Sequence, residues 1–314
     1  MKTIYLNNDT PQLDGPSVAT IGFFDGVHRG HQYLIGHVMA VAKASQMRSM
    51  VITFDRHPRQ VLNDDYQPRL LTTLDEKLLL LARTGVETVV VLYFTPEMAA
   101  LSARDFMDDV LKERLGVAKL VIGYDNRFGH DRRCGFEDYV EFGKEIGIWV
   151  IRSQAFVLHG INVSSSVVRE MVGEGDVERA RDCLGYPYSI MGTVVHGLEN
   201  GRKMGFPTAN IDLRDSGQLV PAPGVYAVRA RTGQSMAYHR GMLNIGTRPT
   251  FGGTRLSIEV NLFNWADDLY GQELTVCFIH RIREERKFDT IKDLEEQLKR
   301  DKSQIEQLFN QETE

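Results

Sequence analysis

Short, almost wholly apolar runs alternate with longer amphipathic stretches over the first half of the chain. The apolar runs are rich in β-branched residues, as strands buried on both faces should be, and lie at 18–23, 50–54, 87–94, 119–123 and 148–151. Between them, helical spacing of apolar residues recurs at 31–45, 74–84, 103–115 and 136–146. This alternation predicts an α/β domain in which helices cover a doubly wound parallel sheet. Ligands bind such a sheet at the carboxyl ends of its strands.

The pattern changes in the second half of the chain. Segment 164–184 is predicted to form two short helices separated at 173–175, and 185–188 is predicted to be a linker. Strand-like runs divided by Gly, Pro and Asn turns then follow at 189–195, 224–231, 241–245, 256–263 and 274–279. They predict a small antiparallel β-barrel. A terminal helix at about 290–309, with a capping box of Thr290 and Asp293, completes the second domain. We therefore expect two domains, 1–184 and 185–314.

Composition narrows the class of protein. The chain has 314 residues, of which 42% are hydrophobic and 25% charged, as is usual for soluble globular proteins with two domains. Its net charge of -5 argues against a nucleic-acid partner. The three cysteines lack any paired spacing, which predicts free thiols. Because the sequence shows neither a signal-peptide core nor an 18-residue apolar window, we predict a cytoplasmic protein without a membrane partner.

The first candidate site is the segment 22–31, Gly-Phe-Phe-Asp-Gly-Val-His-Arg-Gly-His. It leads from a predicted strand into a predicted helix, where backbone N–H groups and the helix N-terminus can bind phosphate. His28 and His31 would share a helix face, and Gly30 would leave room for a triphosphate. Two imidazoles suit the charge that develops on an α-phosphate under attack. The alternatives are surface or capping histidines, or a metal site, for which no further ligands have a recognisable spacing.

The second candidate site is the segment 192–210. Gly197, Gly201 and Gly205 would let backbone amides approach phosphates closely. The segment is not a P-loop, because G-x-x-x-x-G-K-[ST] is absent from the chain. Thr208 and Asn210 offer neutral oxygens, which suit a Mg²⁺ ion that keeps several waters and bridges substrate phosphates.

These motifs, in this order, resemble the bacterial bifunctional riboflavin kinase/FMN adenylyltransferases, also called FAD synthetases, over nearly the whole chain. Segment 22–31 is similar to the nucleotidyltransferase element G-x-F-D-G-x-H-x-G-H. Segments 53–58, 123–129 and 163–169 resemble the elements F-x-P-H-P, G-x-D-F-x-F-G and I-S-S-T-x-I-R. Segment 201–210 resembles the riboflavin kinase signature G-R-x-L-G-F-P-T-A-N, and further matches follow at 223–227, 241–246, 248–250, 258–259, 268–271 and 282–288.

The resemblance implies a Rossmann-like nucleotidyltransferase domain and a riboflavin kinase barrel. It implies that ATP phosphorylates riboflavin to FMN and then adenylylates FMN to FAD, with pyrophosphate released and Mg²⁺ as cofactor. Riboflavin, FMN, FAD and ATP would be the small-molecule partners, and the oligomeric state stays open between monomer and weak oligomer. One alternative keeps only the kinase half active. Another is a nucleotide-sensing domain fused to an OB-like barrel that binds single-stranded nucleic acid.

The same resemblance implies roles for particular residues. His28 and His31 would act in adenylyl transfer, and Glu259 would be the general base of the kinase, with Thr208 and Asn210 holding the metal. Flavin contacts are expected from Asp125, Asn126, Arg127 and Arg283. ATP or phosphate contacts are expected from Gly22, Phe23, Asp25, Gly26, Gly30, Ser164, Ser165, Arg169, Gly197, Gly201, Arg202 and Gly205.

Several of these residues have a structural alternative. Ser164 and Ser165 would serve equally well as helix caps. Glu259 lies on an alternating strand, where an outward-facing charge is common, and Arg283 lies in a charged run typical of a solvated face. The chain also departs from the family pattern at Arg56, Asn126, Ser166, Asn261, Asn264 and Trp265. We assign no role to the last three.

Overall fold

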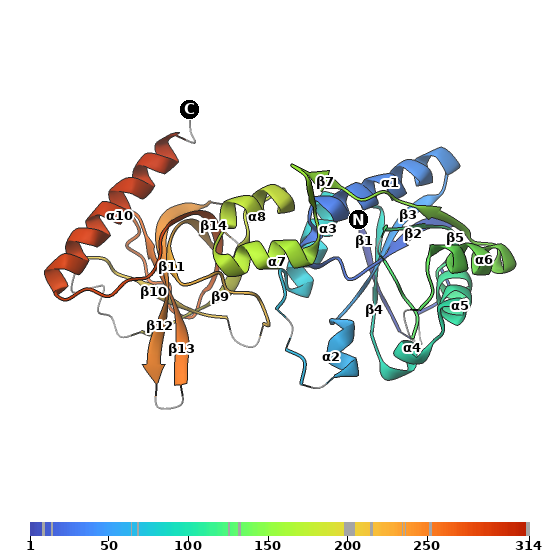
Figure 1. The fold of residues 1–314 in the computed structure, drawn as a ribbon, viewed down its shortest axis with the longest axis horizontal. Helices are drawn as coiled ribbons and strands as arrows, with labels where there is room; N and C mark the ends of the chain where they lie inside the picture. Colours follow the sequence, from blue (N-terminus) through green and yellow to red (C-terminus); the bar gives the residue numbers. More distant parts are fainter. Residues whose placement is uncertain are drawn as a thin grey trace. The chain divides into compact units, whose positions relative to one another are not determined.

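The computed structural model divides the chain into two compact units, Met1–Ser165 and Ser166–Glu314 (Figure 1). It describes all residues except 8, 9, 14, 64, 68, 125, 131, 132, 198–204, 214, 215, 234, 236, 251, 252 and 312–314, and it leaves the side chains of 248–250 and 253–255 undescribed. The division between the units falls after Ser165. The predicted domain boundary after residue 184 stays a prediction.

A six-stranded sheet in the order β1-β4-β3-β2-β5-β6 forms the first unit. Every neighbouring pair of its strands is parallel, as predicted. The strands are β1 (Lys2–Leu6), β2 (Ser17–Ile21), β3 (Arg48–Phe54), β4 (Thr88–Leu92), β5 (Val117–Ile122) and β6 (Trp149–Arg152). Strand β1 was not predicted, because only Leu6 of its five residues is buried and the apolar run that marks a central strand is missing.

Helices cover both faces of this sheet. The predicted ones are α1 (Arg29–Ser45), α3 (Leu74–Arg83), α5 (Ala103–Asp105) with its π-helical continuation η2 (Phe106–Arg114), and α6 (Phe136–Ile146). The short elements were not predicted: η1 (Asp25–Val27), α2 (Pro58–Leu62), α4 (Pro96–Ala100), and the hairpin of β7 (Val157–Leu158) and β8 (Ile161–Asn162). They are too short to show a hydrophobic period.

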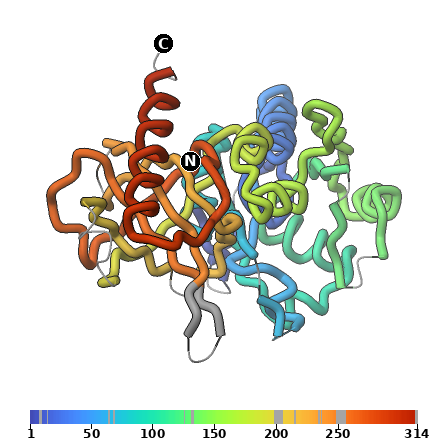
Figure 2. Tube along the Cα trace, turned by 60° about the vertical axis from the view of Figure 1, so that its left-hand side comes forward, coloured from blue at the N-terminus to red at the C-terminus, as the bar shows by residue number. Residues whose placement is uncertain are grey.

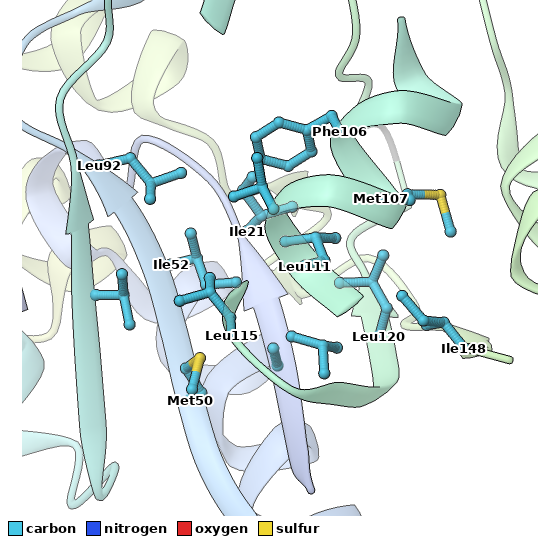
Figure 3. Close-up of a cluster of buried hydrophobic side chains, with 14 of the residues drawn as sticks. Ile21, Met50, Ile52, Leu92, Phe106, Met107, Leu111, Leu115, Leu120 and Ile148 are labelled. Atoms are coloured by element: carbon cyan, nitrogen blue, oxygen red, sulfur yellow. The ribbon is translucent and has the colours of Figure 1, made fainter. Parts of the chain in front are cut away.

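Alternate residues of each strand pack on opposite sides of the sheet. Met50 and Ile52 of β3 join the cluster under η2, whereas Val51 joins the cluster under α1 and α3. Figure 3 shows Met50 and Ile52 on the η2 side, with Phe106 and Leu111 of η2 in the same cluster. Fully burying one such side chain contributes roughly 1.5–3 kcal/mol, so the sheet is a firm platform for the loops at its carboxyl edge.

A closed antiparallel barrel in the order β10-β13-β12-β11-β14-β9 forms the second unit. Its strands are β9 (Ser189–Val195), β10 (Ala209–Asp212), β11 (Gly224–Thr232), β12 (His239–Thr250), β13 (Gly253–Leu262) and β14 (Glu273–Arg283). Five were predicted. The missed strand β10 has four residues, of which only Ile211 is buried, so it shows no clear alternation.

Helix α10 (Ile291–Gln311) packs on the barrel (Figure 2). Its residues Ile305 and Phe309 are fully buried in a cluster with Phe206 and Met242. The predicted N-terminal cap is confirmed, because the Asp293 N–H donates to Thr290 Oγ1 at 3.1 Å.

Helices α7 (Ser165–Glu174) and α8 (Val177–Leu184) confirm the predicted helix pair at 164–184. Both contact β14 within the second unit. Glu178 Oε1 accepts a hydrogen bond from the Arg281 N–H at 3.1 Å, and the Arg281 guanidinium donates to Glu174 O at 3.0 Å. These two helices therefore pack as part of the barrel unit.

Two of the compositional predictions can be compared with the structure. Cys134, Cys183 and Cys277 are all free thiols, as expected. No helix in the described part of the chain has the length and apolar character needed to span a bilayer.

Candidate active sites

The first site forms where β2 turns into α1. Phe24 is left-handed with φ 54°, and Gly26 and Val27 also have positive φ. Such angles are costly for residues with a side chain and persist only where the surroundings enforce them. The turn ends at His28, the N-cap of α1, whose Nδ1 accepts a hydrogen bond from the His31 N–H at 3.2 Å.

The two imidazoles stack on each other with ring centroids 3.6 Å apart. His28 is buried and His31 half-buried, and the Phe24 ring meets His31 edge-on at 5.0 Å. His28 thus caps the helix, as the structural alternative expected. The same contact also aligns both rings at the carboxyl edge of the sheet.

Asp25 joins this turn to the chain before α3. Its buried carboxylate accepts hydrogen bonds from the Leu71 N–H at 3.0 Å and the Thr72 N–H at 3.1 Å. Thr72 Oγ1 in turn accepts one from the Gly26 N–H at 3.1 Å. The carboxylate therefore has a clear positioning function, while its predicted contact with ATP stays a prediction.

Other predicted residues meet the same turn. Ser165 Oγ donates to Asp25 O at 2.9 Å, and the Asn126 amide donates to Ile21 O at the end of β2. The Gly22 N–H donates to Ile52 O at 3.0 Å. The structure also locates three other predicted site residues. Ser164 directly precedes α7, Arg169 lies on α7 in the second unit, and Arg127 is exposed. Asp125 lies outside the described residues.

Gly30 is required by packing at this site. A Cβ there would lie 3.0 Å from both His28 Nδ1 and Val163 O. The sequence suggested that Gly30 leaves room for a triphosphate. The structure adds a second reason for a glycine at this position, because the first turn of α1 packs closely against His28 and the backbone at Val163.

Replacing Gly30 by alanine is expected to displace His28 and to slow FAD formation about tenfold, as about 1.4 kcal/mol of lost positioning would. Gly36 lies on the same helix with no atom within 4 Å of its would-be Cβ. Gly36→Ala should therefore keep FAD formation unchanged. Equal rates for both variants in a chromatographic FAD assay would contradict this assignment.

Lys77 of α3 is a residue of this site that the sequence did not single out. Its side chain is 2% exposed, and Nζ donates to Phe23 O at 3.1 Å and Phe54 O at 3.0 Å. Burial lowers the pKa of Lys77 to about 8, against the opposing charges of Asp25 and Asp55. The one available signal was its position in the apolar stripe of a predicted helix, between Leu74 and Leu81.

The second site lies on three neighbouring strands of the barrel. Glu259 of β13 is opposite Asn210 of β10 on one side and Asn244 of β12 on the other. Directly opposed residues share one face of a sheet with Cβ atoms about 5 Å apart. Thr208 Oγ1 lies 3.4 Å from Glu259 Oε2. The structure thus brings together the predicted base and both predicted metal ligands.

Two cavities meet at Thr208, which lines both. The larger one has a volume of about 760 Å³, and the stacked rings of His196 and Tyr270, 3.7 Å apart, belong to its wall together with Trp265. The smaller one has a volume of about 290 Å³ and is lined by Glu259 and Arg283 among others. A nucleotide and an acceptor substrate can therefore lie on either side of the Thr208–Glu259 pair.

The glycine loop contacts this site through Gly197. A Cβ on Gly197 would fall on the Asn210 carboxamide, so a glycine is needed for close packing there. Gly205 has a φ of 75°, which favours glycine. Gly201 and Arg202 lie outside the described residues, and their predicted phosphate contacts stay predictions.

Asn261, for which no role was predicted, positions the loop that carries Thr208. Its amide donates to Pro207 O at 2.7 Å, and its side chain lines the smaller cavity. Asn261 lies two positions further along β13 than Glu259, on the same face of the strand, and is opposite Met242 of the cluster that α10 covers. A departure from the family pattern thus has a local structural role.

Arg283 is held by helix α10. Its guanidinium donates to both carboxylate oxygens of Asp301, from Nε to Oδ1 at 3.2 Å and to Oδ2 at 3.0 Å, and from Nη2 to Oδ2 at 2.8 Å, and Asp301 is 1% exposed. Arg283 is therefore not a solvated charge, and it lines the smaller cavity. Its predicted contact with flavin remains a prediction.

Removing the Asp301 carboxylate should destabilise the second unit. We expect Asp301→Ala to lower the free energy of unfolding by about 3 kcal/mol, since it strands a largely buried guanidinium. For a unit of this size the midpoint would fall by about 6–12 °C in calorimetry. The exposed Glu296 on the same helix gives the matched control, Glu296→Ala, which should change stability by less than about 0.5 kcal/mol. A barrel transition unchanged in Asp301→Ala would refute this reading.

The described residues contain no group of three His, Cys, Asp or Glu side chains suited to a metal ion. The donors at Thr208 and Asn210 are neutral oxygens beside a single carboxylate. They fit Mg²⁺, which commonly binds through one carboxylate, substrate phosphates and water. They do not fit a tightly coordinated structural metal such as zinc.

Comparison with known proteins finds a family match for each of the two parts of the chain that carry the candidate sites. A family model described as FAD synthetase matches residues 10–167, and one described as riboflavin kinase matches residues 184–309. A bifunctional riboflavin kinase/FMN adenylyltransferase from Escherichia coli K12 is 39% identical over 93% of this chain and 92% of its own. One from Bacillus subtilis 168 is 36% identical over 99% of both chains.

A solved structure also matches along the chain. It is the crystal structure of a protein described as a macrolide-efflux protein from Streptococcus pneumoniae, with a TM-score of 0.86 and 32% identity over 96% of this chain and 98% of that one. The likeness shows a shared fold, and the efflux description applies to that protein alone.

An α/β nucleotidyltransferase unit followed by a kinase barrel defines a two-domain transferase. More narrowly, the chain belongs to the bifunctional riboflavin kinase/FMN adenylyltransferase family.

Proposed function

We propose that this protein phosphorylates riboflavin to FMN with one ATP and adenylylates FMN to FAD with a second, releasing pyrophosphate. We assign residues 1–184 to adenylyl transfer and 185–314 to phosphorylation. The observation that carries the kinase assignment is the Thr208–Glu259 pair at the junction of two cavities. The stacked histidines at the strand-to-helix turn carry the adenylyltransferase assignment.

Phosphorylation requires a base beside the attacking hydroxyl. Glu259 lines the smaller cavity, so the flavin is placed there with its ribityl 5′-hydroxyl toward the carboxylate. ATP then occupies the larger cavity, with its γ-phosphate toward Thr208. Glu259 accepts the hydroxyl proton as that oxygen bonds to the γ-phosphorus, and the bond to ADP breaks.

The metal of this half is proposed to be Mg²⁺, held by Thr208 and Asn210. Bound there, it would neutralise charge on the phosphates of the nucleotide. Asn261 supports this arrangement by fixing the backbone at Pro207. Arg283, braced by Asp301, presents its charge to the flavin cavity.

Adenylyl transfer uses the first unit. A phosphate oxygen of FMN attacks the α-phosphorus of ATP, and pyrophosphate leaves. His28 and His31 stabilise the charge that develops on the α-phosphate, since their rings are already aligned before the substrate arrives. The helix N-terminus and the amides of the turn bind the remaining phosphate oxygens.

A timed incubation with riboflavin, ATP and Mg²⁺, followed by chromatography of the flavins, tests this function. FMN should appear first and FAD second. FMN without FAD would leave only the kinase half active. Unchanged riboflavin, together with no FAD from supplied FMN, would refute the proposal.

We also propose that the protein is cytoplasmic and works as a monomer or weak oligomer without nucleic-acid or membrane partners. Salt-sensitive retention on an oligonucleotide resin would instead favour a nucleic-acid-binding barrel.

A further inference from the structure

We infer that Lys77 is a positioning residue of adenylyl transfer, whose ammonium holds together the two loops that leave β2 and β3 at the first site. The inference rests on the proposed FAD-forming activity. Lys77 is a buried cation that lies outside the segment containing His28 and His31.

The geometry places one ammonium between two strand ends. Phe23 lies two residues after Ile21, the last residue of β2, and Phe54 is the last residue of β3. Lys77 Nζ donates to both of their carbonyl oxygens, at 3.1 Å and 3.0 Å, and lies 4.2 Å from the centre of the Phe23 ring. Thr53 Oγ1 donates to the same Phe23 oxygen at 3.1 Å. Both loops are thus tied to α3 through a single group.

Helix packing alone does not call for a lysine here. Leu74, Leu78 and Leu81 share its stripe and pack against the sheet, so leucine would satisfy the same face. Burying an ammonium is costly unless hydrogen bonds compensate. The lysine is therefore best explained by the two carbonyl groups that it holds.

The charge also matters for the expected ligands. The carboxyl edge of a parallel sheet presents carbonyl oxygens, which repel phosphate oxygens. An ammonium on two of these carbonyls offsets their partial negative charge next to the turn that ends in the stacked histidines. It also fixes Phe23, whose ring meets His57 edge-on at 4.9 Å.

The charged or titratable groups around Lys77 are Asp25, Asp55, Glu76 and His57. The two aspartates favour the ammonium, while burial opposes it and lowers the pKa of Lys77 to about 8. Burial raises the pKa of the Glu76 carboxyl. A decline in FAD formation centred near pH 8 that is lost in Lys77→Met therefore reports on Lys77, and riboflavin phosphorylation, which we assign to the other unit, should not share it.

The test compares full-length Lys77→Met and Lys77→Arg with the wild type from pH 6 to 9.5. FMN adenylylation and riboflavin phosphorylation are measured on the same preparations, so the kinase is an internal control. At pH 7, Lys77→Met should lose at least tenfold in kcat/KM for FAD formation, keep its kinase rate within twofold, and lack the decline near pH 8. Lys77→Arg should shift that decline beyond pH 9, because guanidinium stays protonated.

Lys119→Met is the matched control, since Lys119 is a half-buried lysine of β5 that donates to Ser45 Oγ at 2.7 Å. It should leave both pH profiles unchanged. The inference is overturned if Lys77→Met retains FAD formation within threefold, or if the wild-type profile is flat from pH 7 to 9. The second outcome needs no variant and so does not depend on Lys77→Met folding. A wild type that makes FMN and no FAD would instead refute the proposed function itself.

Discussion

Replacing Glu259 by glutamine should slow riboflavin phosphorylation by about 10²–10⁴-fold, the usual contribution of a general base. Glutamine keeps the size and the hydrogen bond to Thr208 but cannot accept the proton of the attacking hydroxyl. FMN conversion to FAD should continue at the wild-type rate, because that chemistry belongs to the other unit. Separate assays with riboflavin and with FMN measure the two rates.

The matched control is Glu273→Gln, an exposed glutamate of β14 in the same barrel. It should leave both activities unchanged. If Glu259→Gln kept more than a tenth of the kinase rate, Glu259 would not be the base, and the site would act through positioning and charge alone.

Replacing His31 by alanine should reduce FAD formation by about 10²–10³-fold, the usual effect of losing one preorganised group that stabilises developing charge. His31 is the better target of the pair, because His28 also caps α1 and its loss would cost about 1 kcal/mol of stability. Riboflavin phosphorylation should stay within twofold. Initial rates of FAD and pyrophosphate release measure the change.

His37→Gln, on the same helix, provides the control for this variant. His37 is half-buried and lies 3.3 Å from Ser153 Oγ, away from the stacked pair. It should keep FAD formation near the wild-type rate. If FAD formation were unchanged in His31→Ala, the stacked histidines would have no role in adenylyl transfer, and their function would be limited to capping α1.

The long elements of the fold were predictable because their patterns are strong. The central strands are buried on both faces, and helices such as α1 and α6 have clear apolar stripes. Strands β1 and β10 were missed because each has one buried residue, and they exist through pairing with distant partners. Pairing of this kind leaves no local signal.

The candidate sites show the same division. Motif spacing pointed to His28 and His31 and to Thr208 and Asn210, and the family resemblance added Glu259. The structure brings each set together. Spacing gave no sign that Lys77 is held by the ends of two strands. It also assigned nothing to Asn261, which supports the Thr208 loop from the neighbouring strand.

By itself, the sequence determined the two fold classes, the order of the long elements and the location of both chemical motifs, since these depend on local periodicity and short spacings. Tertiary structure decided which groups are buried and what each one touches. Asp25 became a hydrogen-bond anchor, Arg283 an ion pair with Asp301, and Lys77 a cation held between two loops. The physical reason is that solvation, cross-strand pairing and long-range hydrogen bonds depend on residues far apart in the chain, and no local pattern records which of them will meet.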